Sequence, residues 1–231
     1  MRIEGSTAFV TGANRGLGRH FAEQLLARGA AKVYAGARRP ESVTLAGVTP
    51  VQIDITDPES VAAAADLATD TTLLVNNAGT ASFNGLLEGP MSDIRGEMES
   101  HYFGTLSVTR AFAPHLKANA PAAILNILSV LSWLHPGGVG AYSGAKAALW
   151  AQTNSVRDEV DPHSVTVTAL HVGYMDTDMV SGVDAPKSDP AAVASAALDG
   201  VEQALVEVLG DELTRQVKAG LSADRGSATS R

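Results

Sequence analysis

Cysteine is absent from this chain of 231 residues, aromatic residues make up only 5%, and no long apolar run occurs. The missing thiols exclude disulfide bonds, cysteine nucleophiles and thiolate metal sites. No apolar stretch reaches the roughly 20 residues that a membrane-spanning helix needs, so we expect no membrane partner. The formal net charge of −8 argues against a nucleic-acid partner, because nucleic acids bind basic surfaces. Apart from His101, the histidines (His20, His115, His135, His163 and His171) show no paired ligand spacing, and we expect no metal site.

The two ends of the sequence lead to separate expectations. The first residues, Met1–Gly5, lack the basic and then apolar pattern of a secretory signal, so we expect a cytoplasmic protein. Residues 222–231 are small and polar, and we expect a disordered tail there. The length between these ends suits a single domain, over residues 1–221, that holds both the cofactor site and the substrate site.

Apolar strand patterns alternate with helical patterns along the chain. The expected strands cover residues 6–11, 31–36, 49–53, 72–75, 122–127, 165–170 and 206–209. The expected helices cover residues 17–28, a segment from about 57, and the segments near 91–117, 141–160, 190–204 and 211–220. This alternation with short connections predicts an α/β fold, a Rossmann-type doubly wound parallel sheet of about seven strands. Helices on both of its faces would make three α/β/α layers.

A glycine-rich turn follows the first expected strand and reads Thr-Gly-Ala-Asn-Arg-Gly-Leu-Gly over residues 11–18. Glycines let the backbone turn tightly and approach a pyrophosphate, whose charge is favoured by the N-terminus of the next helix. The alternative is an ordinary βα turn with no ligand. The turn predicts a dinucleotide site that includes Gly12, Asn14, Arg15, Gly16, Leu17 and Gly18.

The end of the second expected strand bears on the choice of dinucleotide. An NAD enzyme has an acidic residue there for the ribose hydroxyls, but this chain has Gly-Ala-Arg-Arg over residues 36–39. Arg38 and Arg15 could bind a 2′-phosphate together, because guanidinium groups match phosphate geometry. We therefore expect NADP(H) as the preferred cofactor, with NAD(H) still possible.

Tyr142 and Lys146 lie one helical turn apart, so they face the same way. A cation beside a phenol lowers the pKa of the phenol toward neutrality. Such a phenol can give a proton to a carbonyl oxygen or take one from an alcohol. The hydroxyl of Ser129 can hydrogen-bond the same oxygen, and the hydride must come from a nicotinamide.

Four motifs occur together in a fixed order: Gly-x-x-x-Gly-x-Gly from residue 12, Asn-Asn-Ala-Gly from residue 76, Ser129, and Tyr-x-x-x-Lys from residue 142. From residue 6 to about 210 the chain resembles the short-chain dehydrogenase/reductase family. The resemblance implies that Tyr142 and Lys146 also contact the cofactor, and that helices 91–117 and 141–160 form a homodimer or homotetramer. It further implies cofactor contacts at Asp54, Ile55, Asn77, Ala78, Gly79, Gly173, Met175 and Thr177.

Two positions depart from the family pattern. Val172 stands where the family has proline, which should cost rigidity more than function. His101 stands where the family has an asparagine that binds a water of the proton relay. We hypothesise that His101 is a fourth catalytic residue that takes over this relay, since a neutral imidazole has one donor and one acceptor. The alternative is that His101 only fills space.

These features predict an oxidoreductase, an NADPH-dependent enzyme that reversibly reduces a ketone or aldehyde to an alcohol. A non-catalytic NADPH-binding regulator and another reaction on the same fold, such as epimerisation, remain as alternatives. A dehalogenase relative would have Arg in place of Lys146 and a disrupted glycine turn, and neither change is present. The short segment 180–189 suggests an open substrate pocket. We expect that pocket to be apolar and lined by Phe83, Trp133, Leu134, Val139, Tyr174 and Met179.

Overall fold

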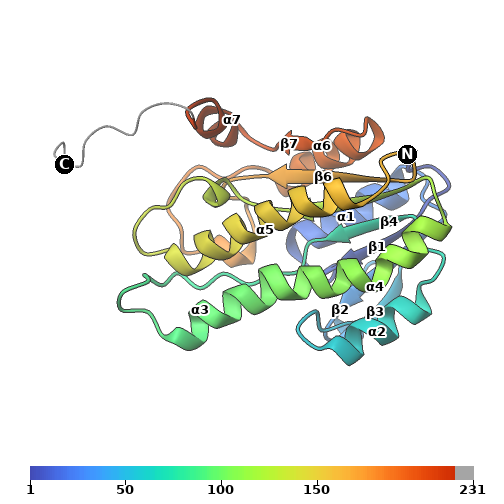
Figure 1. Cartoon of the computed structure of the whole chain (residues 1–231), viewed down its shortest axis with the longest axis horizontal. Coiled ribbons are helices and arrows are strands. Elements are labelled where there is room, and N and C mark those ends of the chain that lie inside the picture. Colours follow the sequence, from blue (N-terminus) through green and yellow to red (C-terminus); the bar gives the residue numbers. More distant parts are fainter. Residues whose placement is uncertain (222–231) are drawn as a thin grey trace.

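The computed structural model describes residues 1–221, and a parallel sheet flanked by helices forms their core (Figure 1). In the described residues the sheet has seven strands in the order β3-β2-β1-β4-β5-β6-β7, all paired in parallel. The strands are β1 (Thr7–Thr11), β2 (Lys32–Ala37), β3 (Thr49–Gln52), β4 (Leu73–Asn76), β5 (Ala122–Ile127), β6 (Val165–His171) and β7 (Glu207–Leu209). The central strands are almost wholly buried, as a parallel sheet covered on both faces requires. The predicted doubly wound fold is confirmed.

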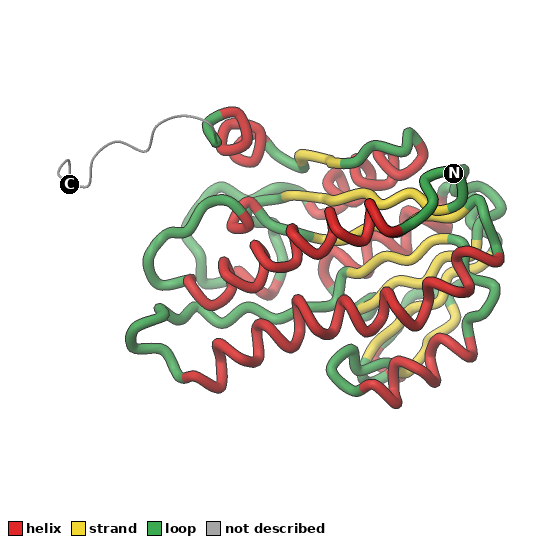
Figure 2. Tube along the Cα trace, in the orientation of Figure 1, coloured by secondary structure: helices red, strands yellow, loops and turns green. Residues whose placement is uncertain are grey.

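Helices cover both faces of the sheet (Figures 1 and 2). On one face, α1 and α6 share a core with the strands through Phe21 and Leu198. On the other face, the ring centroid of Phe112 from α4 lies 4.7 Å from that of Phe9 in β1. The helices are α1 (Gly16–Ala27), α2 (Pro58–Leu67), α3 (Met91–Met98), α4 (Thr105–Ala118), α5 (Gly140–Glu159), α6 (Pro190–Glu202) and α7 (Glu212–Ala219). Three short 3₁₀ turns are η1 (Pro40–Ser42), η3 (Val130–Ser132) and η4 (Asp178–Val180).

Aspartates start three of these helices. The side chains of Asp57, Asp189 and Asp211 each accept a hydrogen bond from a backbone N–H in the first turn of α2, α6 and α7, respectively. Such caps satisfy amides that have no partner within the helix. Proline follows the cap in α2 and α6, where its fixed φ suits the first helical position. These local signals explain why most predicted boundaries lie within one or two residues of the observed ones.

One predicted element differs from the structure. The segment 91–117, expected as one continuous α-helix, consists of α3, a π-helical turn η2 (Glu99–Gly104) and α4. The wider π turn brings Ser100, His101 and Gly104 into the interior, and such turns are frequent at functional sites. The tail predicted over residues 222–231 lies outside the described residues.

The strand order places a crevice at the carboxyl edge of the sheet. The chain leaves β1 toward β2 on one side and leaves β4 toward β5 on the other, although β1 and β4 are neighbours. Ligands of open α/β sheets bind at such a switch point. No helix within residues 1–221 has the length and apolar composition to cross a membrane. Over the same residues, no group of three or more metal-ligating side chains gathers.

Candidate active site

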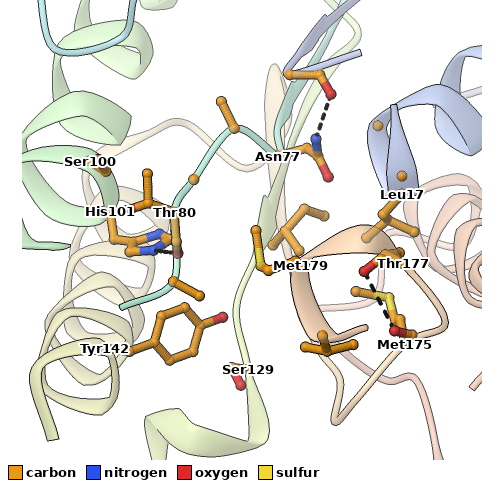
Figure 3. A pocket seen from close by; sticks show the side chains of 18 of the residues that line it. Leu17, Asn77, Thr80, Ser100, His101, Ser129, Tyr142, Met175, Thr177 and Met179 are labelled. Carbon is orange, nitrogen blue, oxygen red and sulfur yellow. Dashed lines mark hydrogen bonds between the residues drawn. The ribbon is translucent and has the colours of Figure 1, made fainter. Parts of the chain in front are cut away.

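A cavity of about 670 Å³ opens at the carboxyl edge of the sheet, beside the switch point between β1 and β4. Figure 3 shows its inner part, where side chains from several separate segments face one another. Every catalytic and cofactor-binding residue predicted from the sequence lines this cavity, from Gly12 near the N-terminus to Thr177 near the C-terminus. The fold therefore brings together residues that lie far apart in the sequence.

The glycine-rich turn forms one wall of the cavity. Gly12 has a φ of +67°, which disfavours other residues, and a Cβ at Gly18 would lie only 2.2 Å from the carbonyl oxygen of Gly12. Asn77 braces the turn, because its Nδ2 donates to the carbonyls of Thr11 (2.9 Å) and Gly12 (3.2 Å). The N-cap residue of α1, Arg15, makes no side-chain cap, and no acid lies in the first turn. A narrow glycine cradle at an uncapped helix N-terminus fits a pyrophosphate.

The outer end of the cavity carries charged groups. Arg38 is exposed at the end of β2, as predicted, and the adjacent Asp54 accepts hydrogen bonds from the backbone N–H (3.0 Å) and hydroxyl (2.7 Å) of Thr56. These bonds, and secondarily the charge of Arg38, hold the pKa of Asp54 below its usual range. Arg15 lies 3.8 Å from Asp178 on η4, and both side chains are largely exposed.

The segment after β6 lines the opposite wall. The backbone N–H of Gly173 donates to Oδ2 of Asp211 at 2.5 Å, and the hydroxyl of Thr177 lies 3.5 Å from the carbonyl of Met175 (Figure 3). Val172, in place of the family's proline, is buried, and its carbonyl accepts a hydrogen bond from the N–H of Val130 (2.9 Å). A backbone and a carboxylate contact therefore hold the segment that carries Val172.

Tyr142, Ser129 and Lys146 meet at the inner end of the cavity. The hydroxyl of Ser129 lies close enough to Tyr142 to act on its pKa, and it accepts a hydrogen bond from the N–H of Leu131 (3.1 Å). Lys146 is buried, and its Nζ donates to the carbonyl of Ile127 (2.8 Å) and lies 5.6 Å from the ring centroid of Tyr142. Figure 3 shows the phenol of Tyr142 directed into the cavity toward Ser129.

A buried ladder of amides sets the position of α5 and so of Tyr142. Nδ2 of Asn76 in β4 donates to Oδ1 of Asn126 in β5 (2.9 Å), and Nδ2 of Asn126 donates to the hydroxyl of Thr153 in α5 (3.0 Å). Asn76 also donates to Thr109 in α4 (3.1 Å). Because unpaired buried amides are costly, this ladder fixes both helices against the sheet.

The pKa shifts of Tyr142 and Lys146 differ from the sequence prediction. We expected Lys146 to lower the pKa of Tyr142, but burial raises that pKa despite the opposing effect of the nearby Ser129 hydroxyl. Burial also lowers the pKa of Lys146 to about 7. Both shifts have one cause, because burial removes the water that would stabilise the charged form of each group.

His101 lies on the other side of the tyrosine ring. The two ring centroids are 5.2 Å apart at 88°, and Nε2 of His101 lies 2.8 Å from the carbonyl oxygen of Thr80 and 3.2 Å from Oε2 of Glu97. Burial and then the charge of Lys146 lower the pKa of His101, against the opposing effects of Glu97 and Thr80. These effects together disfavour the protonated ring, which is the direction that the relay hypothesis needs.

Comparison with known proteins identifies the family. Residues 6–188 match the family model described as short chain dehydrogenase. The chain belongs to the short-chain dehydrogenase/reductase family. It is therefore an enzyme of this type, an oxidoreductase that works with a nicotinamide cofactor.

Three relatives illustrate the range of similarity within the short-chain dehydrogenase/reductase family. The 3-oxoacyl-(acyl-carrier-protein) reductase of Vibrio cholerae is 30% identical over 193 residues, which cover 80% of this chain and 79% of that protein. The 1-deoxy-11-beta-hydroxypentalenate dehydrogenase of Streptomyces exfoliatus is 33% identical over 202 residues, with 81% and 74% covered. The crystal structure of a short chain dehydrogenase from Burkholderia cenocepacia in complex with NADP has a TM-score of 0.93 and 43% identity, with 97% and 96% covered.

The apolar end of the cavity agrees only in part with the sequence prediction. Four of the six expected residues line it, namely Phe83, Leu134, Tyr174 and Met179. Trp133 instead lies beneath the site, where its ring stacks on His171 with a centroid distance of 3.8 Å. Val139 is the N-cap residue of α5 and does not line the cavity. Neither Trp133 nor Val139 therefore belongs to the cavity wall.

Sequence reasoning missed three residues that support this short-chain dehydrogenase/reductase site. Glu97 was detectable, because it stands four residues before His101 and so shares its helical face. Asp211 was recognisable only as the start of a helix, and its bond to Gly173 is a tertiary contact. His171 is fully buried behind Ser129, with Nδ1 3.2 Å from the carbonyl of that serine, and a strand pattern gives no sign of this.

Proposed function

We propose that this chain is an NADPH-dependent reductase of bulky or apolar ketones and aldehydes, with Tyr142 as the proton donor. The observation that carries the proposal is the convergence of three groups at the inner wall of one cavity. These are the phenol of Tyr142, the hydroxyl of Ser129 and the buried side-chain amine of Lys146. The glycine cradle borders the same cavity, so a dinucleotide and a carbonyl would meet there.

In the proposed reaction, a bound nicotinamide supplies the hydride for the carbonyl carbon. Tyr142 gives its proton to the carbonyl oxygen, and Ser129 donates a hydrogen bond to the same oxygen as it gains charge. Lys146, Gly173 and Thr177 would hold the ribose and carboxamide of the cofactor.

The charge states support reduction as the favoured direction. A raised pKa keeps the phenol of Tyr142 protonated at neutral pH, as a proton donor needs. Lys146, with a pKa lowered to about 7, can return a proton to Tyr142 near neutral pH. Oxidation of an alcohol would need the phenolate, which burial disfavours.

Two features support NADPH over NADH. Arg38 stands where an NAD enzyme has an acid, and the Burkholderia cenocepacia relative was crystallised with NADP. Arg15 is free to turn toward a phosphate at little cost, because its contact with Asp178 is long and exposed. Surface ion pairs of this kind contribute only about 0–1 kcal/mol.

The cavity wall supports an apolar substrate. Phe83, Leu134 and Met179 line it and remain about half exposed, and exposed apolar groups around a cavity are typical of ligand sites. The short segment that follows η4 folds back through a parallel bridge between Met175 and Ser188.

The reaction type is supported by two relatives. They are named for an oxoacyl and a hydroxypentalenate compound, which fits chemistry between C=O and CH–OH.

We also propose that residues 1–221 act as one domain and that the enzyme assembles as a homodimer or homotetramer through α4 and α5. Phe103, just before α4, is half exposed and lies edge-on to Tyr102, with ring centroids 5.1 Å apart. Trp150 of α5 is also partly exposed. Light scattering at micromolar concentration tests the assembly, and a monomeric mass would contradict it.

The function is tested by initial rates of NADPH consumption with a series of methyl ketones of increasing chain length. A ketose of similar size is the control substrate. If the cavity binds the chain, kcat/KM rises with each buried methylene by up to about fourfold, from ~0.8 kcal/mol per CH₂. Higher rates with the sugar would refute the substrate class, and NADH-favouring kcat/KM values would refute the cofactor preference.

A further inference from the structure

A buried carboxylate stands behind the candidate relay residue. Glu97 on α3 is only 2% exposed, although a charged glutamate is rarely found in a protein interior. It belongs neither to the catalytic group predicted from the sequence nor to the residues that line the cavity. A charge in such a place needs partners that account for it.

The partners of Glu97 are all hydrogen-bond donors. Oε1 accepts from the backbone N–H of Ser82, and Oε2 lies 3.4 Å from the hydroxyl of Thr80 and 3.2 Å from Nε2 of His101. Burial opposes ionisation of Glu97, but the hydrogen bonds from His101 and Ser82 outweigh it and keep its pKa below the usual range. Glu97 is therefore an anion that can only accept hydrogen bonds.

This arrangement decides which imidazole nitrogen carries the proton. Nε2 of His101 faces two acceptors, the carbonyl of Thr80 at 2.8 Å and the carboxylate of Glu97. A neutral ring with its proton on Nε2 leaves Nδ1 as an acceptor. Nδ1 lies toward Gly79, at 3.0 Å from the place of a Cβ on that residue, and the imidazole ring stands perpendicular to the ring of Tyr142, with centroids 5.2 Å apart.

We propose that Glu97 is a positioning residue that fixes the Nε2–H tautomer and the orientation of His101, so that Nδ1 is left as a hydrogen-bond acceptor in the relay beside Tyr142. The inference rests on the proposed function, since a relay has meaning only if Tyr142 exchanges protons. The same carboxylate holds Ser82 and Thr80, so it also ties the loop after β4 to α3. Glu97 and His101 therefore form one unit between that loop and the catalytic tyrosine.

The pH dependence follows from the charges that face His101. Lys146 and burial lower the pKa of His101, while Glu97 and Thr80 raise it. Protonation of Nδ1 removes the acceptor, so an acidic limb in kcat reports this pKa. Glu97→Gln removes the charge that raises the pKa, so the limb must move to lower pH. The charge of Glu97 also raises the pKa of Lys146 and of Tyr142. The same substitution in a His101→Asn background is therefore the matched control.

The experiment has a kinetic arm and a spectroscopic arm. In the kinetic arm, Glu97→Gln moves the acidic limb of the kcat profile to lower pH. It also lowers the plateau of kcat by about 10-fold or more, which is the change expected from losing one hydrogen bond to a charged group. Neither effect remains in the His101→Asn background. An unmoved limb, or the same shift in both backgrounds, overturns the proposal.

In the spectroscopic arm, ¹⁵N shifts of the histidine rings are measured in the holoenzyme, with the His101→Asn spectrum to assign His101 among the six histidines. The natural enzyme shows the proton on Nε2, and a proton on Nδ1 overturns the proposal. This arm needs no substitution at Glu97, so it holds even where Glu97→Gln fails to fold. It also needs no turnover, so it separates failure of this inference from failure of the proposed function.

Discussion

Replacement of Gly79 by alanine probes the contact on which the relay geometry depends. A Cβ at this position would lie 2.3 Å from Cε1 of His101, 3.0 Å from Nδ1 and 3.4 Å from Nε2. Normal contacts between carbon atoms are about 3.5–4.0 Å, so the ring or the backbone must move. The ring cannot retreat easily, because Thr80 and Glu97 hold its Nε2.

The magnitude follows from this clash. Adding a methyl group to a packed interior typically costs about 1–3 kcal/mol, and we expect Gly79→Ala to lower the free energy of unfolding by this amount. The backbone of Gly79 does not lie in the left-handed region, so alanine brings no strain of its own. All three nearest atoms belong to His101. In a His101→Ala background the same change should therefore be neutral, or stabilising by about 0.4–1 kcal/mol.

Denaturant unfolding of the four proteins, at one protein concentration, measures the double-mutant cycle. We expect a coupling energy of about 1–3 kcal/mol between positions 79 and 101. If Gly79→Ala costs the same in both backgrounds, within about 0.5 kcal/mol, the ring does not pack on Gly79 and the reasoning is wrong.

Three further predictions concern other parts of the molecule. Arg38→Asp should lower kcat/KM for NADPH about 10–100-fold more than for NADH, which is the change expected from losing one charge-assisted hydrogen bond to the 2′-phosphate. The control Arg39→Asp should not discriminate between the two cofactors, and an equal effect of Arg38→Asp on both would exclude a phosphate contact. Glu207, whose pKa is lowered to about 2 chiefly by its buried histidine partner, contributes stability that is present above its ordinary pKa of 4.5 and is lost as the pH falls toward 2. Glu207→Gln should therefore cost at most about 3 kcal/mol at pH 7 and little at pH 2, and a deficit that does not change with pH would contradict this. Asp211→Ala removes both the α7 cap and the partner of Gly173, and should cost about 1–2 kcal/mol and raise KM for the cofactor, whereas an unchanged KM would mean that Gly173 is held without it.

Most of the fold could be predicted from local sequence patterns. Apolar runs marked the seven strands, and Pro58 marked the start of α2. The π turn at Glu99–Gly104 was not predictable in this way, because one extra residue in a turn barely changes the helical pattern. Its effect is large nonetheless, since it places His101 in the interior.

The candidate site was predictable where a motif fixes the spacing, as for Tyr142 and Lys146. Its electrostatics were not. The expected low pKa of Tyr142 rested on the nearby lysine alone, whereas the observed shift depends on burial, which only the packed structure defines. The contact between Asp211 and Gly173 joins residues 38 positions apart in the sequence, and no local pattern encodes it.

The most direct measurement of the central claim is the turnover of Tyr142→Phe. This change removes only the phenolic hydroxyl, so NADPH binding, measured by fluorescence titration, should stay unchanged. With a ketone that the natural enzyme reduces, kcat should fall by on the order of 10²–10⁴, the usual contribution of a general acid. A variant that binds NADPH normally and keeps near-full kcat would show that Tyr142 is not the proton donor.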